Sequence, residues 1–161
     1  LRLTAVGILV VYGEEDVNNV MKTYHGTCDC GTTEMSISLP MALDHYAPRA
    51  CDCDFCTRRQ ISYLSDPQGT IAIKSLKPLT ELQQGSNTAT FLSCAVCSTV
   101  MCVSYSNDTR CVGALNASRL TEKKLLKPPV SVSPKTLTAA EKTERWLLVW
   151  SPLALAEKAQ H

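Results

Sequence analysis

The chain has almost no net charge and no long apolar run. Its 161 residues include 16 lysines plus arginines and 15 aspartates plus glutamates, for a formal net charge of +1. A nearly neutral chain gives no electrostatic reason to expect nucleic acid or an anionic membrane surface as a partner. The longest apolar stretch, AVGILVVY at residues 5–12, is too short to span a bilayer. We therefore expect a soluble protein without a nucleic-acid or membrane partner, whose oligomeric state the sequence does not indicate.

Two signals for other kinds of protein are also missing. The sequence has no glycine-rich phosphate loop and no basic run, so nothing favours a nucleotide-binding protein. The apolar stretch near the start lacks a convincing small-residue cleavage site, which argues against a secretion signal. Residues 1–20 are therefore interpreted either as an N-terminal extension before a domain that begins at Met21, or as an extra β-strand.

Cysteine, by contrast, is abundant, with nine in the chain. Several lie in CxC pairs, which cannot form internal disulfides without severe strain, because a disulfide needs Cα atoms roughly 4.4–6.8 Å apart. Closely spaced cysteines without a secretion signal are more typical of metal ligands in a reducing compartment. We expect a cytoplasmic metal-binding protein.

The central part of the chain has the pattern of an all-β domain. Apolar and polar residues alternate with the period of half-buried strands, and turn-forming residues separate these segments. The predicted strands are 34–39, 70–76, 88–94 and 100–105, with turns at 65–69 and 83–87. No long amphipathic helix is expected before residue 135. The length suits one domain with a modest core.

The composition changes near residue 121, where prolines and lysines become frequent. We predict a β domain over residues 21–120, followed by an arm and a C-terminal helix within 121–161. The helix is expected within residues 135–150, with Ser133 or Thr138 as its N-cap and with Pro152 ending or kinking it.

Trp146 and Trp150 are four residues apart and share one face of this predicted helix. We expect the pair to pack onto the domain, the alternative being a groove for a partner.

Four cysteines in two close pairs predict a closed structural zinc site. Zinc–sulfur bonds near 2.3 Å place tetrahedral ligands about 3.8 Å apart. A regular strand holds residues i and i+2 nearly twice as far apart, so the first pair needs a bend, which Gly31 can supply. The second pair is a CxxC turn whose thiols converge. The predicted ligands are Cys28, Cys30, Cys94 and Cys97.

Cys51, Cys53 and Cys56 form a third group in one short loop. Three thiolates leave one coordination position of a zinc ion open, as catalytic sites commonly do. In the alternative, Cys102 or Cys111 supplies a fourth sulfur and closes the site. Spacing alone leaves both open.

Five segments follow one another in the order and spacing of a known family. They are GTCDCG, ACDCDFCTRR, SDPQG, FLSCAVC and CVGALNASRL, within residues 22–120. In these the chain resembles the glutathione-dependent formaldehyde-activating enzyme (Gfa) family, which also includes centromere protein V. The resemblance implies a zinc-ribbon-like, mainly antiparallel β fold with two zinc ions.

The resemblance also assigns roles to the cysteines. It implies a structural zinc at Cys28, Cys30, Cys94 and Cys97. It also implies a catalytic-type zinc at Cys51, Cys53 and Cys56. The family reaction is that of a carbon–sulfur lyase, in which formaldehyde joins the thiol of glutathione to give an S-hydroxymethyl adduct. A small thiol and an aldehyde are thus the expected partners. The chain departs from the family at Ser98, where a glycine is usual, and after residue 120.

Other candidate residues lie near the cysteines. Arg58 and Arg59 can hold a substrate carboxylate, or they can be ordinary surface charges or partners of neighbouring aspartates. His25 and His45 are candidates for acid–base roles, although a lone loop histidine usually has none. Because no general base is evident, a non-enzymatic zinc module that binds another protein remains the competing hypothesis. A redox or metal-buffering thiol protein is a weaker third.

Overall fold

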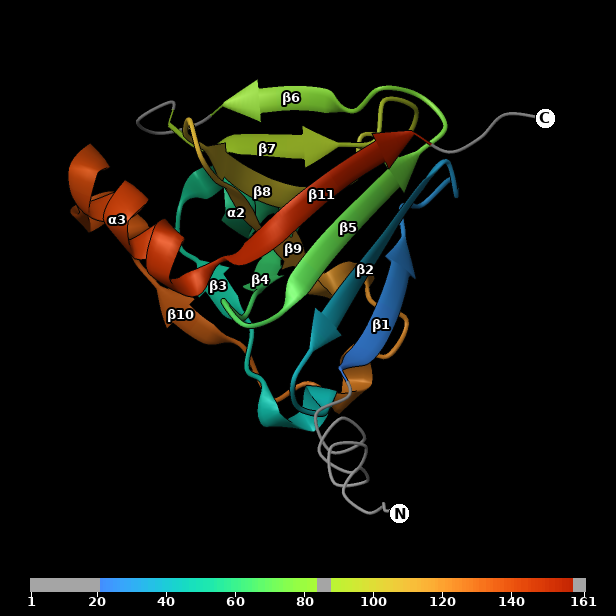
Figure 1. Ribbon diagram of the computed structural model, residues 1–161, viewed down its shortest axis with the longest axis horizontal. Helices are drawn as coiled ribbons and strands as arrows, with labels where there is room; N and C mark the ends of the chain where they lie inside the picture. Colours follow the sequence, from blue (N-terminus) through green and yellow to red (C-terminus); the bar gives the residue numbers. More distant parts are fainter. Residues whose placement is uncertain (1–20, 84–87, 158–161) are drawn as a thin grey trace, which may run out of the picture.

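A computed structural model describes residues 21–83 and 88–157 of the chain. These residues form one extended, twisted β-sheet with a helix at one side (Figure 1). Both interpretations of residues 1–20, extension or extra strand, lie outside the described residues, as does most of the turn predicted at 83–87.

Eleven strands make up this sheet. In chain order they are β1 (Lys22–Thr27), β2 (Thr33–Leu39), β3 (Arg49–Cys51), β4 (Ser62–Leu64), β5 (Thr70–Ser75), β6 (Thr80–Gln83), β7 (Thr90–Ser93), β8 (Val100–Ser106), β9 (Cys111–Asn116), β10 (Val130–Val132) and β11 (Ser151–Glu157). The helices are α2 (Asp54–Arg59) and α3 (Ala139–Val149), and four single 3₁₀ turns lie at Leu43–His45, Ala117–Arg119, Lys123–Leu125 and Pro134–Thr136.

The strand order is β1-β2-β5-β11-β9-β4-β3-β10, and β8, β7 and β6 extend from β9 as a second branch. Most neighbours are antiparallel, the exceptions being β11 beside β5 and β10 beside β3. The predicted fold class, all-β and mainly antiparallel with a C-terminal helix, is confirmed. Figure 1 shows β11 running along β5 through the middle of the molecule.

Alternation in the sequence correctly predicts which side chains enter the core. In β2, Met35, Ile37 and Leu39 are buried, and the first two lie opposite Ile73 and Ile71 of β5. These strands help to form one apolar cluster, which also contains Cys28 and Cys94. A second cluster contains Cys56 with aromatic residues of α2, β4 and β7. Each cysteine group thus adjoins a different part of the core.

The C-terminal helix is found inside the predicted range. Thr138 rather than Ser133 is its N-cap, and Glu141 completes a capping box. The helix ends at Val149, before Pro152, which is the second residue of β11 and lies opposite Val112 of β9. Proline is tolerated near the start of a strand. The sequence did not predict this strand.

The segment expected to be an arm also joins the sheet. β10 pairs in parallel with β3, and the N–H of Asp52 donates to the carbonyl of Val132 at 3.0 Å. Strands β10 and β11 both follow residue 120, where the sequence places the end of the β domain. The sheet therefore continues into the last forty residues, and this continuation brings α3 near the cysteine triad.

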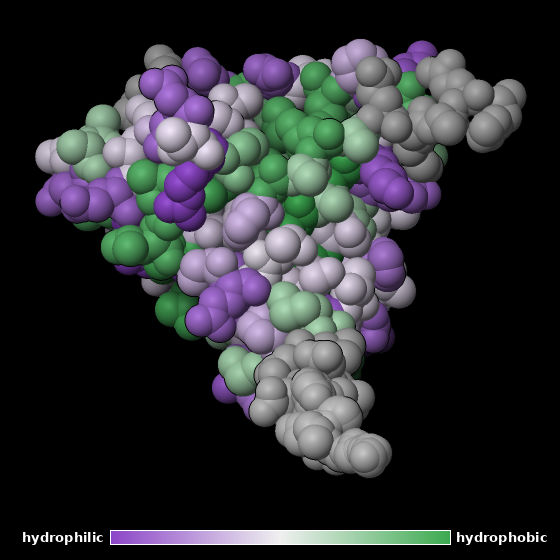
Figure 2. Space-filling view, viewed as in Figure 1, coloured by the Kyte–Doolittle hydropathy of each residue, from purple (hydrophilic) through white to green (hydrophobic). Residues whose placement is uncertain are grey.

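Polar and apolar side chains are mixed on the face seen in Figure 2, with apolar ones gathered over the upper part of the sheet and beside α3. Leu148 of α3 and Leu155 of β11 are exposed. Within residues 21–83 and 88–157, no helix has the length and apolar character needed to cross a bilayer.

Candidate metal centres and the adjoining cavity

The turn between β1 and β2 presents the first cysteine pair. Gly31 has a φ of +82°, which confirms the bend predicted there. The N–H of Gly31 donates to the carbonyl of Cys28 at 3.3 Å, and the N–H of Cys28 donates to the carbonyl of Thr33 at 3.1 Å. This tight turn lets both thiols point the same way although they are only two residues apart.

The second pair lies in the loop between β7 and β8. The N–H of Ser98 donates to the carbonyl of Cys94 at 3.0 Å, and the N–H of Cys94 donates to the carbonyl of Thr99 at 2.9 Å. Ser98 takes a φ of +67° to close this turn. The departure from the usual glycine at Ser98 therefore leaves the turn in place, with an L-residue in the left-handed region.

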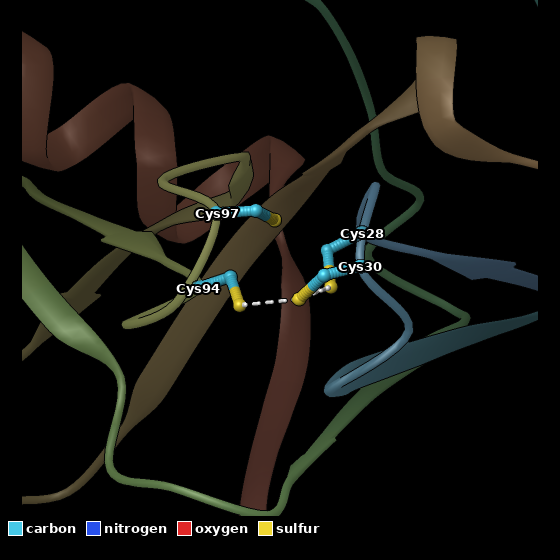
Figure 3. Close-up of side chains that lie close together, drawn as sticks. All are labelled: Cys28, Cys30, Cys94 and Cys97. Carbon is cyan, nitrogen blue, oxygen red and sulfur yellow. Dashed lines mark hydrogen bonds between the residues drawn. The ribbon is translucent and has the colours of Figure 1, made fainter.

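The four thiols of these loops converge, as Figure 3 shows. The Sγ atom of Cys30 lies 3.6 Å from that of Cys28 and 3.7 Å from that of Cys94. The Sγ atom of Cys97 completes the group, and all four sulfurs lie within 4.8 Å of one another. Tetrahedral zinc requires sulfurs about 3.8 Å apart. The group predicted from spacing can therefore hold one metal ion.

Backbone hydrogen bonds to these sulfurs favour the thiolate form that a metal needs, although burial leaves the pKa of Cys28 above its ordinary value. The N–H of Thr33 donates to Sγ of Cys28 at 3.3 Å, and the N–H of Val96 donates to Sγ of Cys94 at 3.4 Å. Burial opposes ionisation of Cys97, but hydrogen bonds from Thr99 and the N–H of Cys30 outweigh it and lower its pKa to about 5.

The triad is assembled by β3 and α2. Cys51 ends β3, Cys53 is the N-cap of α2, and Cys56 lies in the helix. The N–H of Cys56 contacts Sγ of Cys53 at 3.5 Å. The three sulfurs lie within 4.8 Å of one another, so this group too can hold a metal ion.

Neither Cys102 nor Cys111 belongs to the triad. Cys102 is fully buried in β8, in the other core cluster, and burial followed by the charge of Cys111 raises its pKa to about 12. Cys111 begins β9 and is exposed. Among the described residues, no fourth histidine, cysteine, aspartate or glutamate joins the three sulfurs. The open alternative is thus the one that this geometry favours.

A tyrosine that the sequence did not predict as a site residue adjoins the triad. The hydroxyl of Tyr63 in β4 lies 3.2 Å from Sγ of Cys56, and its ring is buried. Burial first, and then the neighbouring Cys56, raises the pKa of this hydroxyl, so that it keeps its proton. A hydrogen bond from the Cys56 thiol lowers the pKa of Cys51 to about 6, and the same bond raises that of Cys56.

The triad opens on a cavity of about 480 Å³, which lies within the size range of small-molecule sites. Residues of β3, α2, β4, β7, β8, β10 and α3 line it. Trp146 and Trp150 stack at 4.8 Å and both line the cavity, so the expected packing of this pair onto the domain is confirmed. Sequence patterns did not reveal the cavity, because its walls come from segments far apart in the chain.

The other sequence candidates lie elsewhere. Arg58 and Arg59 are exposed and border a smaller hollow outside this cavity, where Arg59 stacks on the Phe55 ring at 3.8 Å. His45 lies 3.7 Å from Asp44, and His25 is an exposed residue of β1. Instead, Arg49, Lys142 and Arg145 bring positive charge to the cavity.

The fold and the two cysteine groups define a β-rich protein with two candidate metal centres. No model of a known protein family matches the chain, and neither does any curated protein. Among solved structures, the chain is similar to the crystal structure of a Rhodobacter sphaeroides protein from structural genomics, at 23% sequence identity and a TM-score of 0.49. The match covers 67% of this chain and 99% of that one.

Proposed function

We propose that the protein is a zinc-dependent carbon–sulfur lyase that adds formaldehyde or a related aldehyde to a glutathione-type thiol. The product is an S-hydroxymethyl adduct. The observation that carries this proposal is the triad of Cys51, Cys53 and Cys56, which opens on a cavity and gathers no fourth ligand from the described residues. A module that only binds another protein has no need of such a vacancy.

Two zinc ions per chain fit the donor sets. Cys28, Cys30, Cys94 and Cys97 would hold a structural ion, since four sulfurs fill a tetrahedron. Cys51, Cys53 and Cys56 would hold the second, which when bound supplies Lewis acidity and favours the thiolate form of a substrate. All nine cysteines are free thiols, in keeping with a reducing compartment such as the cytoplasm.

The proposed reaction forms one carbon–sulfur bond and transfers one proton. A carbon–sulfur bond forms between thiol and aldehyde while the S–H bond and the carbonyl π bond break. The proton that leaves the sulfur ends on the former carbonyl oxygen, so no oxidant or reductant is consumed. The aromatic walls limit water around the reactants. Tyr63, still protonated, can donate a hydrogen bond to the Cys56 sulfur and orient it.

The first test is the metal content and coordination of the purified full chain. Two zinc ions per chain, one with three sulfurs and one lighter ligand by X-ray absorption, are expected. A single zinc, or all-sulfur coordination that recruits Cys102 or Cys111, would contradict the proposal and favour the protein-interaction module.

Catalysis is tested by the rate at which formaldehyde exchanges with glutathione in NMR exchange spectroscopy. We expect the chain to accelerate this exchange and Cys53→Ser to abolish the acceleration. Cys111→Ser is the matched control, because Cys111 belongs to neither cysteine group, and it should retain full activity. Equal rates with Cys53→Ser and with the unaltered chain would exclude the triad as the catalytic site.

A further inference from the structure

Apart from the three cysteine sulfurs, the charged groups that line the cavity beside the triad are mostly positive. They are three cations, Arg49, Lys142 and Arg145, and a single carboxylate, that of Asp54. Two side-chain ion pairs seen within residues 21–83 and 88–157, His45–Asp44 and Arg119–Asp29, involve neither cavity arginine.

Arg49 is held by one end of its guanidinium group. Its Nη2 donates to Oγ of Ser65 at 2.5 Å, and Oγ of Ser65 donates to the carbonyl of Val149 at 2.8 Å, where α3 ends. This anchor uses one of the five N–H donors of an arginine side chain. The guanidinium is thus positioned at the cavity wall with donors left for a ligand.

Arg49 of β3 and Arg145 of α3 bring two positive charges to the wall of the same cavity. Two cations facing one partly enclosed space raise the free energy of the empty site, and an anion between them would relieve it. The hydrogen bonds that anchor Arg49 to α3 give Arg49 a structural role. They give no such role to Arg145, which occupies an exposed position on that helix.

The remaining walls select the body of the ligand. Phe91, Val103, Trp146 and Trp150 give the cavity broad aromatic and aliphatic surfaces. Such surfaces favour an apolar ligand body in this part of the cavity. Asp54 and the cysteine sulfurs are the negative groups of the same cavity. Together with the desolvation cost of a second charge, they favour a monoanion over a phosphate dianion.

From these observations we propose that the cavity binds a small apolar monocarboxylic acid. Its carboxylate lies between Arg49 and Arg145, and its carbon body lies against Trp146 and Phe91. This inference rests on the proposed function, because it makes the bound acid the related aldehyde of that reaction, with its carbonyl group at the cysteine triad.

Tryptophan fluorescence gives a direct binding assay. The chain has two tryptophans, and both line the cavity. The probes are 4-phenylbutyrate, the uncharged 4-phenylbutanol with the same body, and phenyl phosphate. We expect the acid to change the fluorescence with a dissociation constant about tenfold lower than that of the alcohol, and to bind more tightly than phenyl phosphate.

Variants locate the carboxylate. Arg145→Gln should weaken binding of the acid about tenfold and leave binding of the alcohol unchanged. Arg49→Gln should act in the same direction, and because its Ser65 anchor also supports α3, the exposed Arg145 provides the cleaner test. Arg58→Gln, which lies outside the cavity, is the matched control and should bind like the unaltered chain.

Besides a failure of the acid to bind at all, three results would overturn the inference. The first is equal affinity for acid and alcohol, and the second is tighter binding of phenyl phosphate. The third is acid binding that survives both arginine substitutions but is lost in Cys53→Ser, which would place the carboxylate at the triad. The assay needs no turnover, so an active enzyme that fails to bind the acid contradicts this inference alone. Acid binding by a protein that has no exchange activity contradicts only the proposed function.

Discussion

Ser98 and Gln60 take a positive φ, the only described residues other than glycine to do so, at 67° and 53°. For an L-residue this conformation costs roughly 1–2 kcal/mol, from which glycine is exempt. Ser98 lies directly after Cys97, so the strain is located in the turn that presents a candidate metal ligand.

We predict that Ser98→Gly raises the free energy of unfolding by roughly 0.5–1 kcal/mol, the relief of strain less the entropy that glycine loses on folding. Urea denaturation of the zinc-loaded chain measures it. Val96→Gly is the matched control in the same loop, since Val96 has no positive φ, and it should bring no gain. An unchanged midpoint for Ser98→Gly would show that the turn is not strained.

Tyr63 allows a test of how the triad is supported. Tyr63→Phe removes the hydroxyl 3.2 Å from Sγ of Cys56, and we expect the zinc affinity of the triad to fall about 10–100-fold, as when other outer-shell partners of metal ligands are removed. Competition with a chromophoric chelator measures this affinity. Tyr46→Phe is the control, because its hydroxyl donates instead to Asp66 at 2.7 Å. Equal zinc affinities in the two variants would deny Tyr63 this role.

At the scale of elements, α3 shows what local sequence can predict. A threonine followed three residues later by glutamate is a recognised helix start, and Thr138 and Glu141 form both hydrogen bonds of the box, at 3.1 and 2.8 Å. The strand after this helix was not predictable in the same way. β11 pairs in parallel with β5, some eighty residues earlier, and no local pattern encodes such a partner.

Because the capping box sets the first turn of α3, Thr138→Ala should lower the free energy of unfolding by about 1 kcal/mol. Urea denaturation measures the change. Thr143→Ala is the matched control within the helix, where the hydroxyl only bonds back to the carbonyl of Ala140 and alanine is the better helix former. A Thr138→Ala variant as stable as Thr143→Ala would show that the cap contributes nothing.

At the scale of the whole molecule, the predictable and unpredictable parts have different physical origins. The cysteine groups were predictable because close spacing forces the thiols of one loop together, as in the pair Cys94 and Cys97. The cavity was not, because Arg49, Phe91 and Trp146 meet only after β3, β7 and α3 have been placed by the sheet. The exclusion of Cys102 from the triad likewise follows from its burial in a different core cluster.

The two cysteine groups should differ in what they do for the whole fold. Cys28 and Cys30 lie between β1 and β2, whereas Cys94 and Cys97 lie between β7 and β8, so a metal ion there ties together elements more than sixty residues apart. Cys51, Cys53 and Cys56 all lie within one short segment, and a metal ion there closes no long loop. Structural zinc contributes folding free energy on the order of 10 kcal/mol, which is comparable to the entire stability of an ordinary domain.

Cys97→Ser should therefore unfold the domain or leave it insoluble, whereas Cys53→Ser should keep the fold and lose one zinc ion. Circular dichroism and zinc content of each variant measure the two effects, with Cys111→Ser as the control for loss of a thiol outside both groups. A well-folded Cys97→Ser protein of unchanged stability would refute the structural assignment. Global unfolding of Cys53→Ser would instead indicate that the triad, too, is a structural site, and the vacancy on which the proposed chemistry depends would lose its support.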